Sequence, residues 1–138
     1  MVHPRQTQYW RVILVPEWGM WETCRDNDVI AIGYPEAPDD ANVRKFRHEM
    51  KIGDKVVAYL KRGQIGAVGT IVGDYSVDEV VLHGHHWRIR KVEWNHKSFN
   101  GWEFALSEGV KTTLGQRSTV VELSESEHGE IEKQKLSL

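Results

Sequence analysis

The sequence predicts an α+β domain built around a small, curved, open β-barrel with helices on its outside. Short apolar runs rich in β-branched and aromatic residues recur along the chain, tight turns separate them, and helical patterns occur early and late. A length of 138 residues fits one domain with one core. We therefore expect a single domain over residues 1–138, with its core at about 9–135.

In the first half of the chain, two apolar runs predict strands and two amphipathic segments predict helices. The first helix holds Trp18 and Trp21 at a spacing that puts both indoles on one face. Either Asp39 or Asp40 is suited to cap the second helix. The expected elements are strands at Tyr9–Val15 and Asp28–Gly33, and helices at Glu17–Asp26 and from Asp39 or Asp40 to about Glu49.

In the second half, strands dominate until a final helix. Three glycines in and just after one strand, at positions 66, 69 and 73, predict bulges or a tight barrel bend. Ser124 and Glu127 form a capping box that opens a helix carrying Ile131. The expected strands are Val56–Leu60, Ile65–Val72, Trp87–Trp94 and Ser118–Leu123; Asp74–Gly84 is expected as a polar loop around Val80–Leu82, and residues 95–106 as irregular.

Composition excludes several classes of protein and leaves one local feature of charge. The chain has 18 Lys and Arg against 20 Asp and Glu, so it is not a globally basic nucleic-acid binder. Residues 44–97, however, carry 11 basic against 6 acidic side chains and hold five of the seven histidines. One cysteine, no secretory signal and no apolar run long enough for a bilayer predict a cytoplasmic protein.

Six tryptophans are more than a domain of this size usually carries. Those inside predicted strands, Trp10 and Trp94, are expected in the core, with Trp102. Aromatic residues at element ends or in loops are the candidates for stacking on a flat ligand such as a nucleobase: Trp18, Trp21, Tyr34, Tyr75 and Trp87. For Trp18, Trp21 and Trp87 individually, core and pocket are equally open at this point.

Catalytic and metal chemistry have little support in the sequence. Phosphate-cradling, nucleophile-elbow and zinc-protease motifs are absent, and Cys24 has no partner motif around it. The tract His83–His86 offers imidazoles without the further ligands of a structural zinc site. We therefore expect no enzyme activity, no metal and no cofactor, and keep a small enzyme or metal protein as the alternative from another class.

Several segments follow one another in a characteristic order: Val29–Tyr34, the Lys-x-Gly-Asp stretch within Met50–Tyr59, Ile65–Val72 and His85–Trp94, with the tail Leu114–Val121 before Ser124–Glu127. This order gives a resemblance to the EVE and YTH branch of the PUA-like superfamily. It covers about residues 9–135. The chain is most similar to the N-terminal DNA-binding domains of McrB-type, modification-dependent restriction systems.

The resemblance implies a nucleic-acid-binding domain that flips a methylated adenine or cytosine, in DNA, into an aromatic pocket. The resemblance also implies that the domain is the targeting module of a restriction or defence system, with a fused or separate NTPase or nuclease effector. The expected pocket residues are Glu17, Trp18, Trp21, Tyr34, Tyr75 and Trp87. The expected phosphate-binding residues are Lys61, Arg62, Arg88, Arg90 and Lys91. The alternatives are an RNA reader of N6-methyladenine or tRNA, and a nucleoside sensor.

Overall fold

The computed structural model describes residues 7–14, 20–32, 41–60, 64–82, 85–94, 101–102, 106–116 and 118–137. The strands are β1 (Tyr9–Ile13), β2 (Val29–Ile32), β3 (Lys55–Tyr59), β4 (Gln64–Ile71), β5 (Ser76–Leu82), β6 (His85–Trp94), β7 (Gly101–Trp102) and β8 (Val120–Leu123). The helices are α1 (Met20–Asn27), α2 (Ala41–Arg44) with its π-helical continuation η2 (Lys45–Glu49), α3 (Glu108–Leu114) and α4 (Glu125–Ser137). None of the described helices has the length and apolar character needed to cross a membrane.

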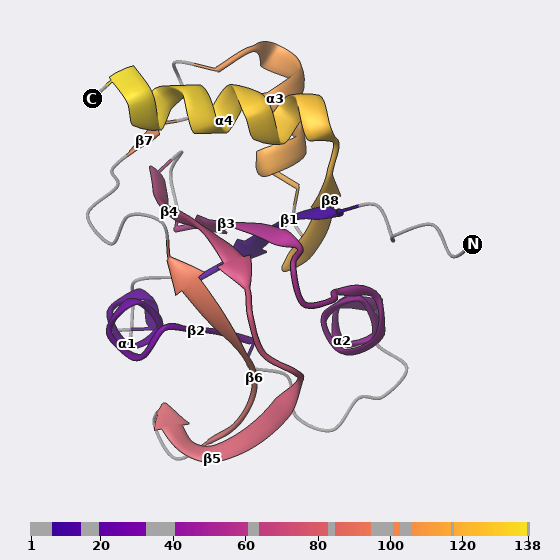
Figure 1. The fold of residues 1–138 in the computed structure, drawn as a ribbon, viewed down its shortest axis with the longest axis vertical. Coiled ribbons are helices and arrows are strands. Elements are labelled where there is room, and N and C mark those ends of the chain that lie inside the picture. The colour runs from indigo at the N-terminus through magenta and orange to yellow at the C-terminus, as the bar shows by residue number, and fades with distance from the viewer. Residues whose placement is uncertain are drawn as a thin grey trace.

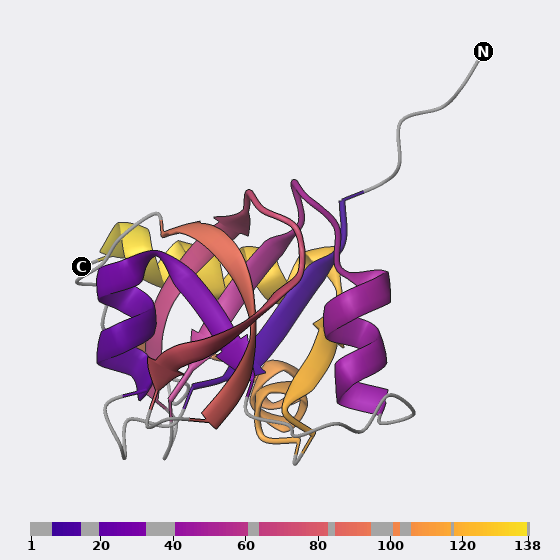
Figure 2. The ribbon, with the colours of Figure 1, turned by 90° about the horizontal axis from the view of Figure 1, so that it is seen from below.

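One mixed, curled sheet forms the centre of the fold, and helices flank it (Figures 1 and 2). Its main path runs β2-β6-β4-β3-β1-β8, with β5 added on β6 and β7 on β4. The pair β1–β3 is parallel, whereas the other described pairs are antiparallel. The predicted α+β class and the curved, open barrel flanked by helices are confirmed.

The long strand β6 joins the two halves of the sheet. Its last residues pair with β4, its middle residues, 88–91, pair with β2, and its first half pairs with β5. Residues 74–84 were expected as a polar loop, and this prediction was wrong because Ser76–Leu82 is strand β5. Asp78 and Glu79 are poor strand formers, but pairing with β6 outweighs that local preference.

Both faces of the central strands are buried. In β3, Val56 and Ala58 face the core inside the curled sheet, whereas Val57 and Tyr59 face a second core under α3 and α4. This alternation follows from the two-residue period of a strand. The inner core also holds Trp10 and Phe46, so the sheet encloses its largest side chains.

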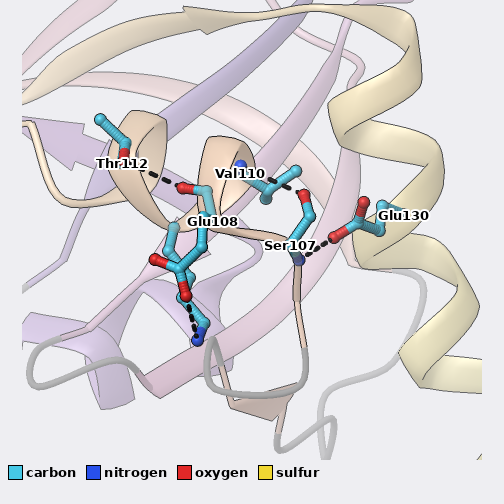
Figure 3. A network of polar contacts seen from close by, with 6 residues as sticks. Ser107, Glu108, Val110, Thr112 and Glu130 are labelled. Carbon is cyan, nitrogen blue, oxygen red and sulfur yellow. Dashed lines mark hydrogen bonds and ion pairs between the residues drawn. The ribbon is translucent and has the colours of Figure 1, made fainter.

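Helix α3 is not predicted by the sequence pattern. Gly109 and two threonines give it a weak intrinsic tendency to form a helix, so its packing and its caps hold it. Ser107 caps its start, accepting from the Val110 amide, and the Ser107 amide donates to Glu130 of α4 (Figure 3). At its end, the buried Arg11 donates to the Leu114 and Gln116 carbonyls at 2.6 and 2.8 Å.

Helix α4 begins at the predicted capping box. The Glu127 amide donates to Ser124 Oγ at 3.1 Å, and the Ser124 amide donates to Glu127 Oε1 at 2.9 Å. These two bonds satisfy donors that a helix start leaves free. Ile131 is fully buried in the core beneath the helix. The predicted cap and the predicted core residue are both confirmed.

Asp54 links the Lys-x-Gly-Asp turn to the first strand. It is buried, and it accepts hydrogen bonds from Trp10 Nε1 at 3.1 Å and from the Gln8 and Lys51 amides. Both carboxylate oxygens are used, which is the geometry that makes a buried charge tolerable. The motif therefore fixes where the chain enters β3 relative to β1.

Replacing Asp54 by Asn is expected to lower the free energy of unfolding by about 2 kcal/mol, because one of the two acceptor oxygens becomes a donor that faces donors. Urea unfolding followed by tryptophan fluorescence measures the change. Asp26→Asn is the control, since Asp26 lies at the surface in an ion pair with Arg25, and exposed ion pairs contribute little to stability. Equal stability of Asp54→Asn and wild type would contradict the assigned role.

Candidate functional site

A hollow of about 600 Å³ opens where the sheet bends between β4 and β5. Helix η2, the turn before β3 and the bend at residues 73–75 surround it, and β6 lies behind it. Its volume lies in the range of small-molecule and nucleotide sites. The residues that line it are Arg47, His48, Met50, Lys51, Ile52, Asp74, Tyr75 and Arg90.

Arg90 fixes the wall of this hollow from inside. Its side chain is 4 % exposed, and its guanidinium donates to the Phe46, Arg47 and Gly73 carbonyls at 2.7, 3.1 and 3.1 Å. Two of these carbonyls belong to the last turn of η2, where a helix leaves acceptors free. Burial lowers the pKa of Arg90, and the charges of Asp74 and Asp54 oppose that shift. One side chain thus holds helix, bend and strand together.

The bend itself requires a glycine. A Cβ atom on Gly73 would lie 2.7 Å from Cβ of Lys91, closer than packed carbon atoms come. The absence of that atom lets the chain turn tightly against β6, where the Val72 amide donates to the Lys91 carbonyl at 3.0 Å. The bend brings Tyr75 over η2.

An aromatic stack forms one side of the hollow. The ring of Phe46 is fully buried and meets the ring of Tyr75 edge to face, with 6.2 Å between the centroids. The Arg47 guanidinium lies over the Tyr75 ring at 5.2 Å. Tyr75 is half-buried, whereas Arg47 is exposed, so the guanidinium presents an outer surface to solvent. Such a cation over a ring is a favourable arrangement.

Positive charge dominates the lining. Arg47, Lys51 and Arg90 are cationic, whereas Asp74 is the one carboxylate among the described lining residues. His48 and Lys51 are exposed, and so is Ile52 at 57 % of its surface. The hollow therefore combines exposed cations, an aromatic stack and an apolar rim. These features together suit a ligand that is anionic and also flat.

The structure gives two predicted site residues a different role. Trp21, expected in the pocket, is 8 % exposed and meets Trp94 edge to face at 5.2 Å within the inner core. Gly66 makes room for it, since a Cβ there would lie 2.9 Å from the Trp21 ring. Arg90, expected to bind phosphate, donates its hydrogen bonds to three backbone carbonyl groups. Both residues help to hold the fold together.

The other predicted site residues divide into three groups. Tyr75 lies in the hollow with Arg90, and Lys91 is exposed on β6 beside the bend. For Trp87 and Arg88 the structure describes the backbone, which lies in β6. The remaining predicted residues lie outside the described part of the chain: Glu17, Trp18, Tyr34, Lys61 and Arg62.

Sequence reasoning missed Arg47, His48 and Lys51. All three lie within the basic stretch of residues 44–97, and the run from Arg44 to Lys51 is its densest part. That local run was the available signal. In the predicted helix the apolar stripe identifies the buried face that carries Phe46, and the basic residues on the opposite face read as an ordinary solvated surface.

The described residues offer little for catalysis or metal binding. Burial raises the pKa of the Cys24 thiol to about 12, so the thiolate that a nucleophile needs is disfavoured. No group of three His, Cys, Asp or Glu side chains able to hold a metal occurs in the part that the structure describes. His83 lies outside that part, and of His85 and His86 only the backbone lies within it.

Comparison with known families gives a match over residues 37–124 to the family described as Domain of unknown function (DUF8426). The chain belongs to this family. The matched segment includes η2, the bend at residues 73–75 and β6, and so the whole hollow. No curated protein matches the sequence.

Solved structures with a similar fold include YTH domains. The Mmi1 YTH domain matches 96% of this chain and 79% of its own at a TM-score of 0.70 and 13% identity. The YTH domain of Zygosaccharomyces rouxii MRB1, in complex with N6-methyladenosine RNA, matches 97% of this chain and 90% of its own, at a TM-score of 0.63 and 14% identity. Protein Atu2648 from Agrobacterium tumefaciens matches 93% of this chain and 92% of its own, at a TM-score of 0.59 and 19% identity. The YTH-like fold that the sequence predicts is thus confirmed.

Replacing Arg90 by Met is expected to lower the free energy of unfolding by about 3 kcal/mol or more, because three carbonyl oxygens around the bend lose their charged donor. Urea unfolding measures the loss. The neighbouring Lys91→Met is the control, since Lys91 is exposed and surface changes stay within about 0.5 kcal/mol. Similar stabilities of the two variants would show that Arg90 does not hold the bend.

At pH 8, Cys24 is expected to react with a disulfide reagent far more slowly in the folded chain than in urea. Its raised pKa of about 12 and its burial keep both thiolate and reagent away in the native state. The release of the coloured thiol measures the rate. Fast native reaction, at the rate of the unfolded chain, would contradict a structural cysteine.

Proposed function

We propose that this domain is a non-enzymatic reader of a modified base in a nucleic acid. The observation that carries the proposal is the fold, which matches a YTH domain solved with N6-methyladenosine RNA over 97% of this chain. The exposed cations and the aromatic stack beside the sheet bend support it, since such groups bind phosphates and bases. The buried Cys24 gives no support to a nucleophilic enzyme.

The base pocket is proposed where the end of β2 meets the start of β6. Ile32, at the end of β2, pairs with Arg88, which adjoins Trp87 in β6. Tyr34 follows Ile32 by two residues in the sequence, and we propose it as the second aromatic wall of the pocket beside Trp87. Glu17 and Trp18 complete the proposed pocket. Of the six residues expected there, Trp21 is withdrawn to the core and Tyr75 belongs to the hollow.

The energetics favour discrimination without catalysis. Stacking a base on an aromatic ring contributes about 1–3 kcal/mol, which offsets the few kcal/mol needed to extrude the base from a duplex. Burying a methyl group adds about 0.8 kcal/mol. Methylation of an exocyclic amine also removes a proton that would stay unpaired in a dry pocket, at about 1–3 kcal/mol. These gains are large enough to separate modified from unmodified strands.

The target and the setting follow from two different resemblances. The sequence resembles McrB-type domains, which favours methylated DNA, a cytoplasmic restriction or defence system, and a fused or separate NTPase or nuclease partner. The MRB1 structure favours RNA carrying N6-methyladenosine. We propose the DNA target, with RNA as the second candidate, and matched probes decide between them.

Fluorescence anisotropy with matched probes tests the function. The probes are duplex DNAs with no modification, N6-methyladenine or 5-methylcytosine, and the corresponding single-stranded RNAs. We expect at least a tenfold preference for one modified probe, which corresponds to about 1.4 kcal/mol. Trp87→Ala and Tyr34→Ala are expected to abolish the preference by removing a stacking wall, whereas Trp87→Phe retains most of it.

Thermal unfolding of each variant accompanies the titrations, so that lost binding is separated from lost structure. Equal affinity for modified and unmodified probes in the wild type would overturn the proposed reader. A preference that survives both Trp87→Ala and Tyr34→Ala in folded protein would move the pocket elsewhere. A preference confined to RNA probes would replace the DNA target by the RNA one.

A further inference from the structure

Two hollows on the described surface have linings of opposite charge. The second, about 410 Å³, lies between β1, β8 and the start of α4, and its charged lining residues are Glu122 and Glu125. An acidic groove repels a polyanion. The hollow at the sheet bend has the opposite charge, and it is built from the buried Arg90 outward. It is therefore the hollow suited to an anionic ligand.

The cations of this hollow are arranged for an anion. Arg47 and Lys51 come from two different segments, the end of η2 and the turn before β3, yet both line the same opening. Each is exposed, and neither has an ion-pair partner among the described contacts. Arg90 adds a fixed positive charge behind them, against the single carboxylate of Asp74. A phosphate group at the opening is the complement of this set.

The stack beside the cations selects the rest of the ligand. Phe46 backs Tyr75, and the Arg47 guanidinium covers the Tyr75 ring and exposes its own outer surface. Nucleobases stack both on aromatic rings and on guanidinium planes. Ile52, which is 57 % exposed at the rim, adds an apolar contact for a sugar or base. A carboxylate-bearing peptide would use the cations but not this flat surface.

We propose that the hollow is a nucleotide subsite for a single-stranded nucleic acid, with a phosphate on Arg47 and Lys51 and an unpaired base on the Arg47–Tyr75 stack. The subsite is independent of base modification. It deepens the proposed function, because it supplies affinity for the strand while another pocket reads the modified base. Its residues differ from those assigned to that pocket, so the two can fail separately.

The test uses the full chain and fluorescein-labelled, unmodified ten-nucleotide single strands of DNA and RNA. Arg47→Gln and Lys51→Gln are each expected to weaken binding about fivefold at 0.1 M salt, and to reduce the slope of log K against log salt by about 0.7, the loss of one phosphate contact. Tyr75→Ala is expected to lose at least about fivefold, whereas Tyr75→Phe keeps the stack and the affinity.

Lys133→Gln is the matched control, because it removes one exposed positive charge from α4, a helix that does not line the hollow. Losses in Arg47→Gln and Lys51→Gln no larger than in Lys133→Gln would overturn the proposal. So would a wild-type chain that binds none of these strands. Hexaglutamate that competes as well as an unlabelled strand would replace the nucleotide by an acidic peptide.

Comparing modified with unmodified strands separates the two proposals. If the subsite is correct, its variants weaken binding to both kinds of strand by the same factor, and the ratio between them stays at the wild-type value. If the wild type binds modified and unmodified strands equally and the hollow variants weaken both, the base reader is overturned and the subsite stands. If the wild type prefers modified strands and the hollow variants bind as well as the wild type, the subsite is overturned and the base reader stands.

Discussion

The guanidinium of Arg90 makes the contacts on which the half of the molecule around the sheet bend depends. The strands β4 and β5 separate at the bend, and helix η2 ends beside it, so three pieces of chain meet without a shared hydrogen-bond ladder. Arg90 bonds to a carbonyl in the bend and to two in the helix, from a strand that belongs to the sheet. Only arginine carries enough donors in one rigid plane to do this.

Two other buried charges work in the same way elsewhere. Arg11 closes the end of α3 and joins it to β1, and burial lowers the pKa of Arg11 to about 10. Asp54 joins the turn before β3 to the first strand. In each case a buried polar side chain satisfies backbone groups that irregular chain would otherwise leave unpaired. The apolar core sets the thickness of the fold, and these contacts determine how its loops and short helices attach.

Strands β1 to β4 were predictable because their apolar runs are continuous, as a sheet buried on both faces requires. Helix α3 and strand β5 were not, since the intrinsic preferences of their residues are weak, and contacts with Arg11 and with β6 help to hold them in place. The alternation along β6 already placed Arg90 on the face of Val92 and Trp94, which are buried. Its charge nevertheless led to a phosphate-binding prediction. Local sequence cannot distinguish a solvated arginine from one that caps carbonyl groups.

A slightly acidic chain that binds a polyanion must concentrate its positive charge. At physiological ionic strength charges separated by more than about 8 Å are screened, so the net charge of the molecule matters less than the group beside the bend. Arg47 and Lys51 share one opening there, whereas the first turn of α4, at the far end of the sheet in Figure 1, carries Glu125 and Glu127. This asymmetry favours approach of a strand from the side of the bend. Because the cations stand on a helix end and a turn that buried groups hold rigid, little order remains to be imposed on binding. The buried charges of Arg90 and Asp54 thereby hold in place the segments that carry the exposed cations.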